Sequence, residues 1–424
     1  MEKEWLTHKL KHNSLRALSL VKWLAFAILM GLLCGLVGAV FYRGVALATS
    51  ARFAHPYLLF LLPVGGCEIV WLYRRMGFQK AIGTNLVLDA IHSGDVIPLR
   101  LSLLIFLSTI FSHLSGASVG REGAALQIGG SLGQNVGKLF RFDDNDRNTI
   151  TMCGMSAVFS ALFGTPIAAS FFSMEVVSVG IMHYAALVPC VLSSVIARAV
   201  AQRLGAPAPF YDIASEIPAA TILTVTKAAA LAAAAGLVSI LFVVSLHAAS
   251  AMEKKLFSSR YAQALIGGLI LLLLTFLTGF TDQRYNGAGV QVIAAAMEGN
   301  VHGYDFLLKI LFTAISIACA YKGGEIVPSF YIGATFGAAF ATLLGLSPAL
   351  GAAVGIGALF FGVTNCPVTA LLICFELFGM QGWTYYLVGV AIAYVVSGYF
   401  GVYSSQTIVY SKFHSNYINK STHM

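Results

Sequence analysis

The chain has 424 residues, of which 58% are hydrophobic and only 10% are charged, and its formal net charge is +8. Because an ordinary soluble domain carries about 25% charged residues, this composition excludes a soluble globular protein. The basic residues stand at the ends of apolar segments, so the positive charge indicates membrane topology and does not indicate a nucleic-acid surface.

The first segment, residues 1–18, is basic and precedes a long apolar run over residues 21–41. Positive charge beside the first membrane segment predicts a cytoplasmic N-terminus. The run is too long for a secretory signal and lacks its cleavage pattern. Further apolar runs follow at 58–72, 101–114, 228–246 and 264–280. Several runs reach the roughly 20 residues that span a bilayer, so we predict an all-α polytopic membrane protein embedded in lipid.

Glycine-rich polar breaks interrupt the apolar runs. GTN at 83–85 precedes a short predicted helix, and GREG at 120–123 precedes a helix expected over 124–136. A third break, GEIVP at 324–328, carries a proline that suits a first helical turn. A helix N-terminus exposes unpaired N–H groups and a positive dipole end, which favour an anion. Within a bilayer such ends must be buried or line a cavity, so their convergence predicts an anion site built from backbone amides.

The second half of the chain repeats the first at an offset of about 204 residues. GREGAALQIGGSLG at 120–133 aligns with GEIVPSFYIGATFG at 324–337. A second match follows in the same order, between PIAASFFSME at 166–175 and PVTALLICFE at 367–376. Paired interruptions of this kind are typical of transporters built from two repeats with the binding site between them. The predicted parts are a cytoplasmic segment 1–18, a first repeat 19–204, a connector 205–222, a second repeat 223–410 and a tail 411–424.

Arg121 and Glu122 are ionisable residues in an otherwise apolar region. A carboxylate at a helix start can occupy the anion site itself and swing away when it is protonated. The alternative is that Glu122 complements the dipole of its own helix and pairs with Arg121. Ionisable residues inside a membrane are functional candidates, so Glu122 is a candidate for gating and proton transfer. Arg121 is expected to hydrogen-bond buried carbonyls or a carboxylate.

These motifs resemble those of the CLC family of chloride channels and proton-coupled anion antiporters. GREGA at 120–124 is similar to the family's G-R-E-G-P, GEIVP at 324–328 to its G-x-F-x-P, and Tyr403 to its anion-coordinating tyrosine. The resemblance implies the CLC fold, with two inverted-topology halves of broken, tilted helices, and a homodimer with one anion path per subunit. It also implies that Glu122 gates the path and that the Tyr403 hydroxyl binds the anion. The alternative for Tyr403 is the interfacial aromatic belt.

Departures from the chloride motifs make the chain similar to the fluoride-exporting clade of this family. GTNLV at 83–87 replaces G-S-G-I-P, and Val176 stands where chloride antiporters hold a proton-relay glutamate. Thr84 and Asn85 offer a hydroxyl and amide N–H groups to small, strongly hydrated fluoride, and their alternative role is helix N-capping. Glu325 is a second switchable carboxylate, or else it complements its helix dipole.

The predicted site therefore combines two carboxylates with a set of donors. The gating and proton-transfer groups are Glu122 and Glu325. The anion-binding residues are Thr84, Asn85, Gly123, Ile326, Val327 and Tyr403. The supporting residues are Gly120, Arg121, Gly324 and Pro328. Glu175 and Glu376, which are repeat partners, are expected to make structural hydrogen bonds at helix ends.

The resemblance and these departures imply a fluoride/proton antiporter that exports fluoride from the cytoplasm through a bacterial inner membrane, with both termini cytoplasmic. The alternatives are a chloride transporter of the same fold and a passive fluoride or chloride channel. No enzyme, metal or cofactor is expected, since the ten histidines form neither the H-E-x-x-H nor the H-x-x-E-H zinc motif. The seven cysteines lie in apolar stretches without C-x-x-C and are interpreted as buried hydrophobic residues.

Overall fold

The computed structural model describes residues 2–78, 83–94, 97–412, 414 and 416–422. Parts of the predicted N-terminal segment and tail, Met1, 413, 415 and 423–424, lie outside the described residues. The first half of the chain forms α1 (Glu2–Ala54), α2 (Leu62–Arg75), α3 (Asn85–Ser93), α4 (Leu99–Ser115), α5 (Glu122–Leu139), α6 (Asp144–Phe163), α7 (Pro166–Glu175) and α8 (Leu187–Arg203). The second half forms α9 (Ile222–Leu256), α10 (Arg260–Thr278), α11 (Val290–Met297), α12 (Asp305–Ala318), α13 (Ile326–Leu344), α14 (Pro348–Thr364), α15 (Pro367–Phe378) and α16 (Trp383–Val396).

The two halves thus have the same order of long and short helices, in agreement with the predicted duplication. Six helical segments of the described chain are long and apolar enough to cross a bilayer, and four other apolar helices are shorter. Short helices such as α7 and α15, which both begin at a proline, are the broken elements that the glycines and prolines predicted. The prediction of a helical, multi-pass membrane fold is confirmed.

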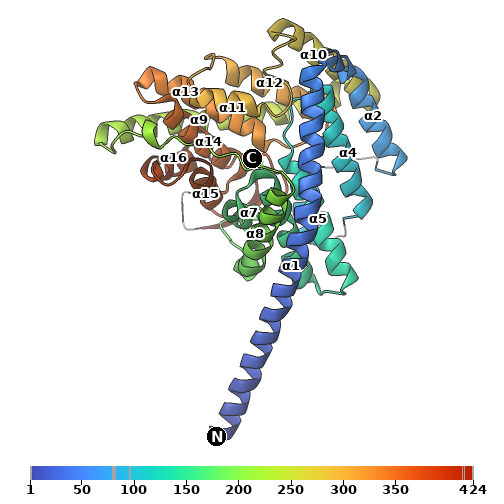
Figure 1. Ribbon diagram of the computed structural model, residues 1–424, viewed down its shortest axis with the longest axis vertical. Coiled ribbons are helices and arrows are strands. Elements are labelled where there is room, and N and C mark those ends of the chain that lie inside the picture. Colours follow the sequence, from blue (N-terminus) through green and yellow to red (C-terminus); the bar gives the residue numbers. More distant parts are fainter. Residues whose placement is uncertain (1, 79–82, 95–96, 413, 415, 423–424) are drawn as a thin grey trace.

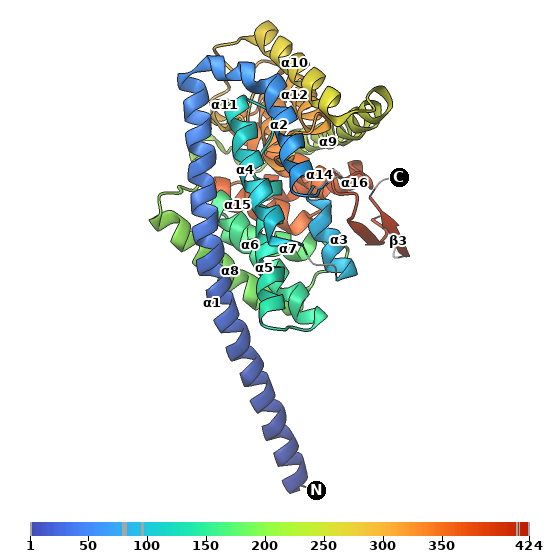
Figure 2. The same cartoon turned by 90° about the vertical axis from the view of Figure 1, so that its right-hand side faces the viewer.

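Helix α1 runs along the side of the helical body and projects beyond it at its N-terminal end (Figures 1 and 2). Its apolar part, Ala17–Ala54, contains the apolar run that was predicted as the first membrane segment, residues 21–41. The predicted cytoplasmic segment 1–18 is the projecting start of the same helix, and no turn separates it from the apolar part. The body of the molecule gathers the remaining helices around α5, α6, α13 and α14.

The helix pairs α5–α6 and α13–α14 pack with their main chains in contact. A methyl group added at Gly129 would overlap the main-chain carbonyl of Gly154, and one added at Gly333 would lie 2.6 Å from the carbonyl oxygen of Gly355. Lipid tails are as apolar as side chains, so close packing through small residues contributes much of the association of membrane helices. Gly129 and Gly333 are repeat partners, so both halves pack a central helix pair through a main-chain contact at glycine.

Two glutamates join the halves by capping helices across the repeat. The Glu376 carboxylate accepts hydrogen bonds from the amides of Ile167 and Ala168 in the first turn of α7, at 3.0 and 2.8 Å. In return, Glu175 accepts the amide and the hydroxyl of Thr369 in the first turn of α15, at 3.0 and 2.6 Å. Each carboxylate thus accepts hydrogen bonds from first-turn backbone amides, which have no acceptor within their own helix. The predicted structural role of both residues is confirmed.

A small sheet, which the sequence did not predict, ties the segment after α7 to the C-terminal part of the chain. Strand β1 (Ser178–Val179) pairs in parallel with β2 (Thr407–Tyr410), and β2 pairs antiparallel with β3 (Tyr417–Ser421). Single 3-10 turns precede α2 and α8 and interrupt the connector before α9, at η1 (Pro56–Leu61), η2 (Tyr184–Ala186) and η3 (Ala214–Glu216). The sheet places the predicted tail next to the loop that carries the predicted tyrosine ligand.

Candidate functional site

The repeat partners Gly120 and Gly324 pair with each other as an isolated antiparallel bridge. The Gly120 amide donates to the Gly324 carbonyl at 2.7 Å, and the Gly324 amide donates to the Gly120 carbonyl at 2.9 Å. Arg121 and Glu325 follow as the N-cap residues of α5 and α13. The two helices therefore begin side by side, which is the convergence that the aligned breaks predicted.

The first turns of α5 and α13 face each other closely at this point. A methyl group added at Gly123 would lie 3.0 Å from the Gly324 Cα, and one added at Gly120 would lie 3.1 Å from the Pro328 ring. Ile326 and Val327 are buried in the first turn of α13. First-turn amides have no partner within their own helix, so the predicted anion-binding residues Gly123, Ile326 and Val327 all lie where two helix N-termini meet.

Glu122 is fully buried at the start of α5. Its Oε2 accepts a hydrogen bond from the Arg121 amide at 2.8 Å, and its Oε1 lies 3.5 Å from the Arg121 Nε without a hydrogen-bond partner of its own. Glu122 also lines a cavity of about 190 Å³ together with Val327 and residues of the connector, among them Pro207. The carboxylate thus occupies a helix N-terminus, pairs with Arg121, and reaches a cavity.

Arg121 anchors this turn, as its five donors led us to expect. Its Nη2 donates to the Leu162 carbonyl at 3.4 Å, and its guanidinium lies over the Tyr42 ring at 4.6 Å from the centroid. Together with the contact to Glu122, these interactions hold the side chain between α1, α5 and α6. The Arg121 guanidinium, which these contacts hold in place, therefore lies beside the Glu122 carboxylate.

Helix α3 begins at Thr84 and Asn85, and its start lies against Gly123 in the first turn of α5. Residues 79–82, which precede Gly83, lie outside the described chain. Thr84 is buried, and its hydroxyl oxygen lies 2.9 Å from the position of a methyl group added at Gly123. The hydroxyl makes no capping hydrogen bond to α3, so the N-cap alternative is not what the structure shows for its side chain. The Asn85 Oδ1 accepts from the Ser405 amide at 3.3 Å, which links α3 to the Tyr403 loop.

Tyr403 is buried, with 2% of its surface exposed, and its hydroxyl has no hydrogen-bond partner. Both Glu325 and Glu122 lie near enough to interact electrostatically with that hydroxyl. The Tyr403 carbonyl accepts hydrogen bonds from the Thr422 hydroxyl at 2.6 Å and from the Gln406 amide at 3.1 Å. The side chain is thus fixed at the site with a free donor, and it does not belong to an interfacial belt.

Gln406 is a residue that the sequence did not single out. Its buried side-chain amide donates to the carbonyls of Val176 and Thr364, at 3.0 and 2.8 Å, and so bridges the ends of α7 and α14. Val176, at the position where chloride antiporters hold a proton-relay glutamate, is itself fully buried. No local signal in GVYSSQ predicts this role, because the two carbonyls come from distant parts of the chain.

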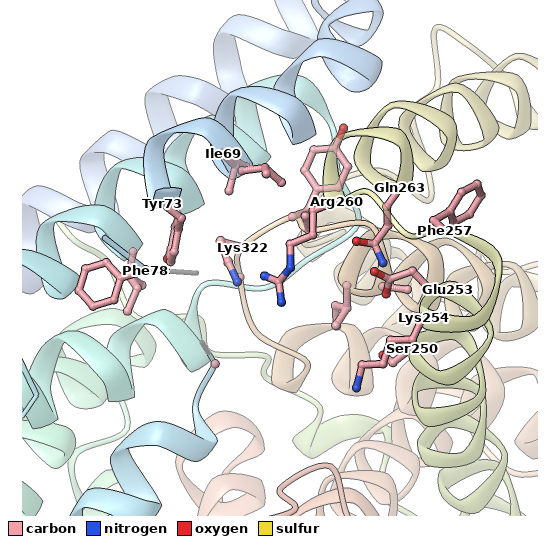
Figure 3. Close-up of a pocket in the computed structure, with 18 of the residues that line it drawn as sticks. Ile69, Tyr73, Phe78, Ser250, Glu253, Lys254, Phe257, Arg260, Gln263 and Lys322 are labelled. Carbon is pink, nitrogen blue, oxygen red and sulfur yellow. The ribbon is translucent and has the colours of Figure 1, made fainter. Parts of the chain in front are cut away.

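Glu325 lines a separate cavity of about 440 Å³, drawn in Figure 3, which also reaches Gly83 and Asn85. Its Oε2 has no hydrogen-bond partner. Charged side chains from α9, α10 and the turn before α13 surround this cavity, and they were not predicted from the sequence: Glu253, Lys254, Arg260 and Lys322. The cavities of Glu122 and Glu325 have no lining residue in common, so the two carboxylates face different spaces from adjoining helix starts.

The chain matches known proteins over most of its length. Residues 65–398 match the family model described as voltage gated chloride channel. A chloride/fluoride channel protein of Pseudomonas syringae pv. tomato is 36% identical over 400 residues, covering 93% of this chain and 88% of that protein. The crystal structure of a CLC-type fluoride/proton antiporter superposes with a TM-score of 0.86 at 31% identity, covering 91% of this chain and 98% of that one.

A slow cyanobacterial Cl⁻/H⁺ antiporter shares the fold, with a TM-score of 0.76 at 20% identity over 88% of this chain and 94% of that one. The sequence match spans more than half of the chain, and the fold, the duplicated helix order and the glycine-bounded helix starts agree with it. The chain belongs to the voltage gated chloride channel family, the CLC family of anion channels and anion/proton antiporters.

Proposed function

We propose that this protein is a membrane antiporter that exchanges cytoplasmic fluoride for external protons, without an enzymatic step. The observation that carries the proposal is the pair of carboxylates, Glu122 and Glu325, at two helix starts that are joined by the Gly120–Gly324 bridge. Each carboxylate lines its own cavity. An exchanger needs groups that take up a proton on either side of the point where the anion binds, and this arrangement supplies them.

The donors around the bridge suit a small, strongly hydrated anion. Fluoride enters such a site only if strong donors replace its water, and the first-turn amides of α5 and α13 with the hydroxyls of Thr84 and Tyr403 supply them. The Glu122 carboxylate carries the same charge at the same helix start, so anion and carboxylate compete for these donors. Protonation of Glu122 relieves this competition, which couples anion movement to proton movement.

Similarity favours fluoride over chloride as the transported anion. The two relatives above that exceed 30% identity are described as a chloride/fluoride channel protein and as a fluoride/proton antiporter. The valine at 176 and the GTN sequence at 83–85 also depart from the chloride motifs in the direction of the fluoride clade. Glu325 supplies a proton-accepting group that does not depend on an acid at position 176.

Assembly and location complete the proposal. We expect a homodimer with one anion path per subunit, placed in a bacterial inner membrane with both termini on the cytoplasmic side. The basic start of α1 agrees with that orientation. The Glu325 cavity would then open toward the cytoplasm and the Glu122 cavity toward the outside, since α9 ends in the first cavity and the connector before α9 lines the second.

Liposomes loaded with sodium fluoride and carrying the purified protein test the exchange directly. A fluoride electrode outside and a pH-sensitive dye inside should record fluoride efflux together with acidification of the lumen. Efflux that leaves the internal pH unchanged would make the protein a passive channel. Chloride flux comparable to fluoride flux would instead make it a chloride transporter of the same fold.

Replacement of the tyrosine hydroxyl should weaken anion binding moderately. Tyr403→Phe removes one donor to a charged ligand, which costs roughly 1.5 kcal/mol, so the half-saturating fluoride concentration is expected to rise on the order of tenfold. Fluoride flux as a function of fluoride concentration measures this change. Tyr410→Phe, an exposed tyrosine of β2, is the matched control. An unchanged half-saturation in Tyr403→Phe would remove the hydroxyl from the anion site.

A further inference from the structure

A third cavity, of about 440 Å³ and distinct from that of Glu325, adjoins the Glu122 cavity. The two cavities share four lining residues: Tyr42, Arg121, Val290 and Val327. The rest of its wall comes from the C-terminal end of α1, His113 of α4, the loop between α10 and α11, and α11 itself. Most of these residues have no part in the proposed exchange site.

Arg52 contributes a buried cation to this cavity. Only 1% of its surface is exposed, and its Nη1 donates to the Gln283 Oε1 at 2.9 Å. The Gln283 amide in turn donates to the Arg52 carbonyl at 3.3 Å. The Arg52 Nε is buried with no hydrogen-bond partner. Among the described residues no carboxylate forms an ion pair with this guanidinium.

Lys309 is a buried lysine behind the same wall. It is fully buried and donates to the carbonyls of Tyr285 and Gly287 at 3.1 and 2.7 Å, while its ammonium lies 4.9 Å from the centroid of the Tyr331 ring. In the described part of the chain its contacts are thus neutral groups, and no ion pair involves it. Lys309 therefore lies behind the cavity wall, held by carbonyls and without a carboxylate partner among the described residues.

The turn before α11 brings these groups together. A methyl group added at Gly287 would lie 2.8 Å from the Arg52 Nη2 and 3.9 Å from the His113 Nδ1. One added at Gly289 would lie 3.6 Å from the Lys309 Nζ. His113 lines the cavity, is 1% exposed, and has a buried Nε2 without a hydrogen-bond partner. The Arg52 Nε and the His113 Nε2 thus lie unpartnered at one cavity, with Lys309 behind its wall.

The other charged residues on the wall do not balance this charge. Arg121 is paired with Glu122, and the Arg284 Nη2 lies 2.6 Å from the Asp305 carboxylate, so these two arginines bring their own counter-ions. Asp282 also lines the cavity, but its side chain is exposed to solvent. A buried guanidinium without a counter-ion carries a desolvation penalty. The dipole at the C-terminal end of α1 offsets part of it for Arg52.

The start of α11 supplies backbone donors to the same space. Gly289, with φ 74°, is the N-cap of α11, and Val290 is its first residue; both line the cavity. Because Lys309 holds the Gly287 carbonyl, the planar trans peptide directs the Ala288 N–H to the opposite side. Helix α11 has the same place in the second repeat that α3 has in the first, so duplication has produced a counterpart of the Thr84–Asn85 helix start.

We propose that this cavity is a second anion-binding site, which takes a small inorganic anion of the halide class. The Arg52 Nε–H and the first-turn amides of α11 bind the anion, the charge of Arg52 holds it, and the His113 ring lines the same space. This α11 anion site requires neither fluoride selectivity nor proton coupling. It lies beside the cavity of Glu122, where it raises the local concentration of anions next to the exchange site.

Bromide tests the site because it is a halide that can be located by anomalous scattering. Crystals of the full chain are grown in sodium bromide, and an anomalous peak is expected between the Arg52 side chain and the first turn of α11. Arg52→Met should remove this peak. Lys22→Met, which removes one positive charge from the same helix at a position paired with Asp146, should leave it unchanged.

Absence of the peak in the wild-type crystals would overturn the proposal, and so would a peak of undiminished height in Arg52→Met. If Arg52→Met does not fold, the wild-type map decides by itself. The liposome experiment tests fluoride/proton exchange independently, because exchange without a bromide peak would refute the α11 anion site alone. A bromide peak without exchange would refute the proposed function alone.

Discussion

Glu122→Gln is expected to stop proton movement in fluoride-loaded liposomes, down to the leak of protein-free liposomes. The amide has nearly the shape of the carboxylic acid but cannot take up and release a proton near neutral pH. Glu122 is buried and pairs with Arg121, and no other carboxylate of the described residues lines its cavity. The internal pH dye measures the effect, and any remaining fluoride flux should no longer respond to a pH gradient.

Two controls make this result interpretable. Glu298→Gln changes an exposed glutamate after α11 and should leave proton movement intact. The elution profile of Glu122→Gln in detergent should match the wild type, because glutamine keeps the size of the side chain and Arg121 keeps its contacts with the Leu162 carbonyl and the Tyr42 ring. If Glu122→Gln still moves protons at the wild-type rate, Glu122 is not the proton-transfer group.

Gly333→Val is expected to prevent the protein from folding. A Cβ at this position would lie 2.6 Å from the Gly355 carbonyl oxygen and 2.9 Å from the Ile356 Cα, so α13 and α14 would have to move apart. Overpacking in a well-packed core commonly costs about 1–3 kcal/mol and at times more, and here main-chain atoms, which cannot change rotamer, are in the way. Separation of α13 would also displace its first turn from the Gly120–Gly324 bridge.

Size-exclusion chromatography in detergent measures this effect as loss of the monodisperse peak. Gly303→Val is the matched control, because a Cβ there would meet no atom within 4 Å. A wild-type elution profile and melting temperature for Gly333→Val would show that the main-chain contact between α13 and α14 is not required. The repeat partner Gly129 is expected to behave in the same way, since its Cβ would overlap the Gly154 carbonyl.

Several parts of the site could be predicted because they are encoded locally or by the repeat. The constant offset predicts that Gly120 and Gly324 are equivalent, and the structure pairs them directly. The positions of glycine and proline predict the first residues of α5 and α13 to within a few residues. The ion pair of Arg121 with Glu122 follows from their adjacency. Capping by Glu175 and Glu376 follows from their repeat-related places after a proline.

Other parts depend on contacts between segments that are far apart in the chain. The Gln406 bridge joins the ends of α7 and α14, and the Arg52 guanidinium meets a loop more than 200 residues away. In the sequence, Arg52 looks like an ordinary basic residue at a segment end. It is buried against the α10–α11 loop and the C-terminal end of α4.

The sequence alone determined the membrane class, the duplication, the family resemblance and the helix starts. These follow from composition, hydrophobic length, glycine and proline positions, and the constant offset, which are all properties of short stretches or of their repetition. The tertiary structure decided which charges are buried, that Glu122 and Glu325 line different cavities, and that the tail forms a sheet beside Tyr403. The physical reason is that helix-to-helix distances are set by contacts such as Gly333 with Gly355, which local periodicity does not encode.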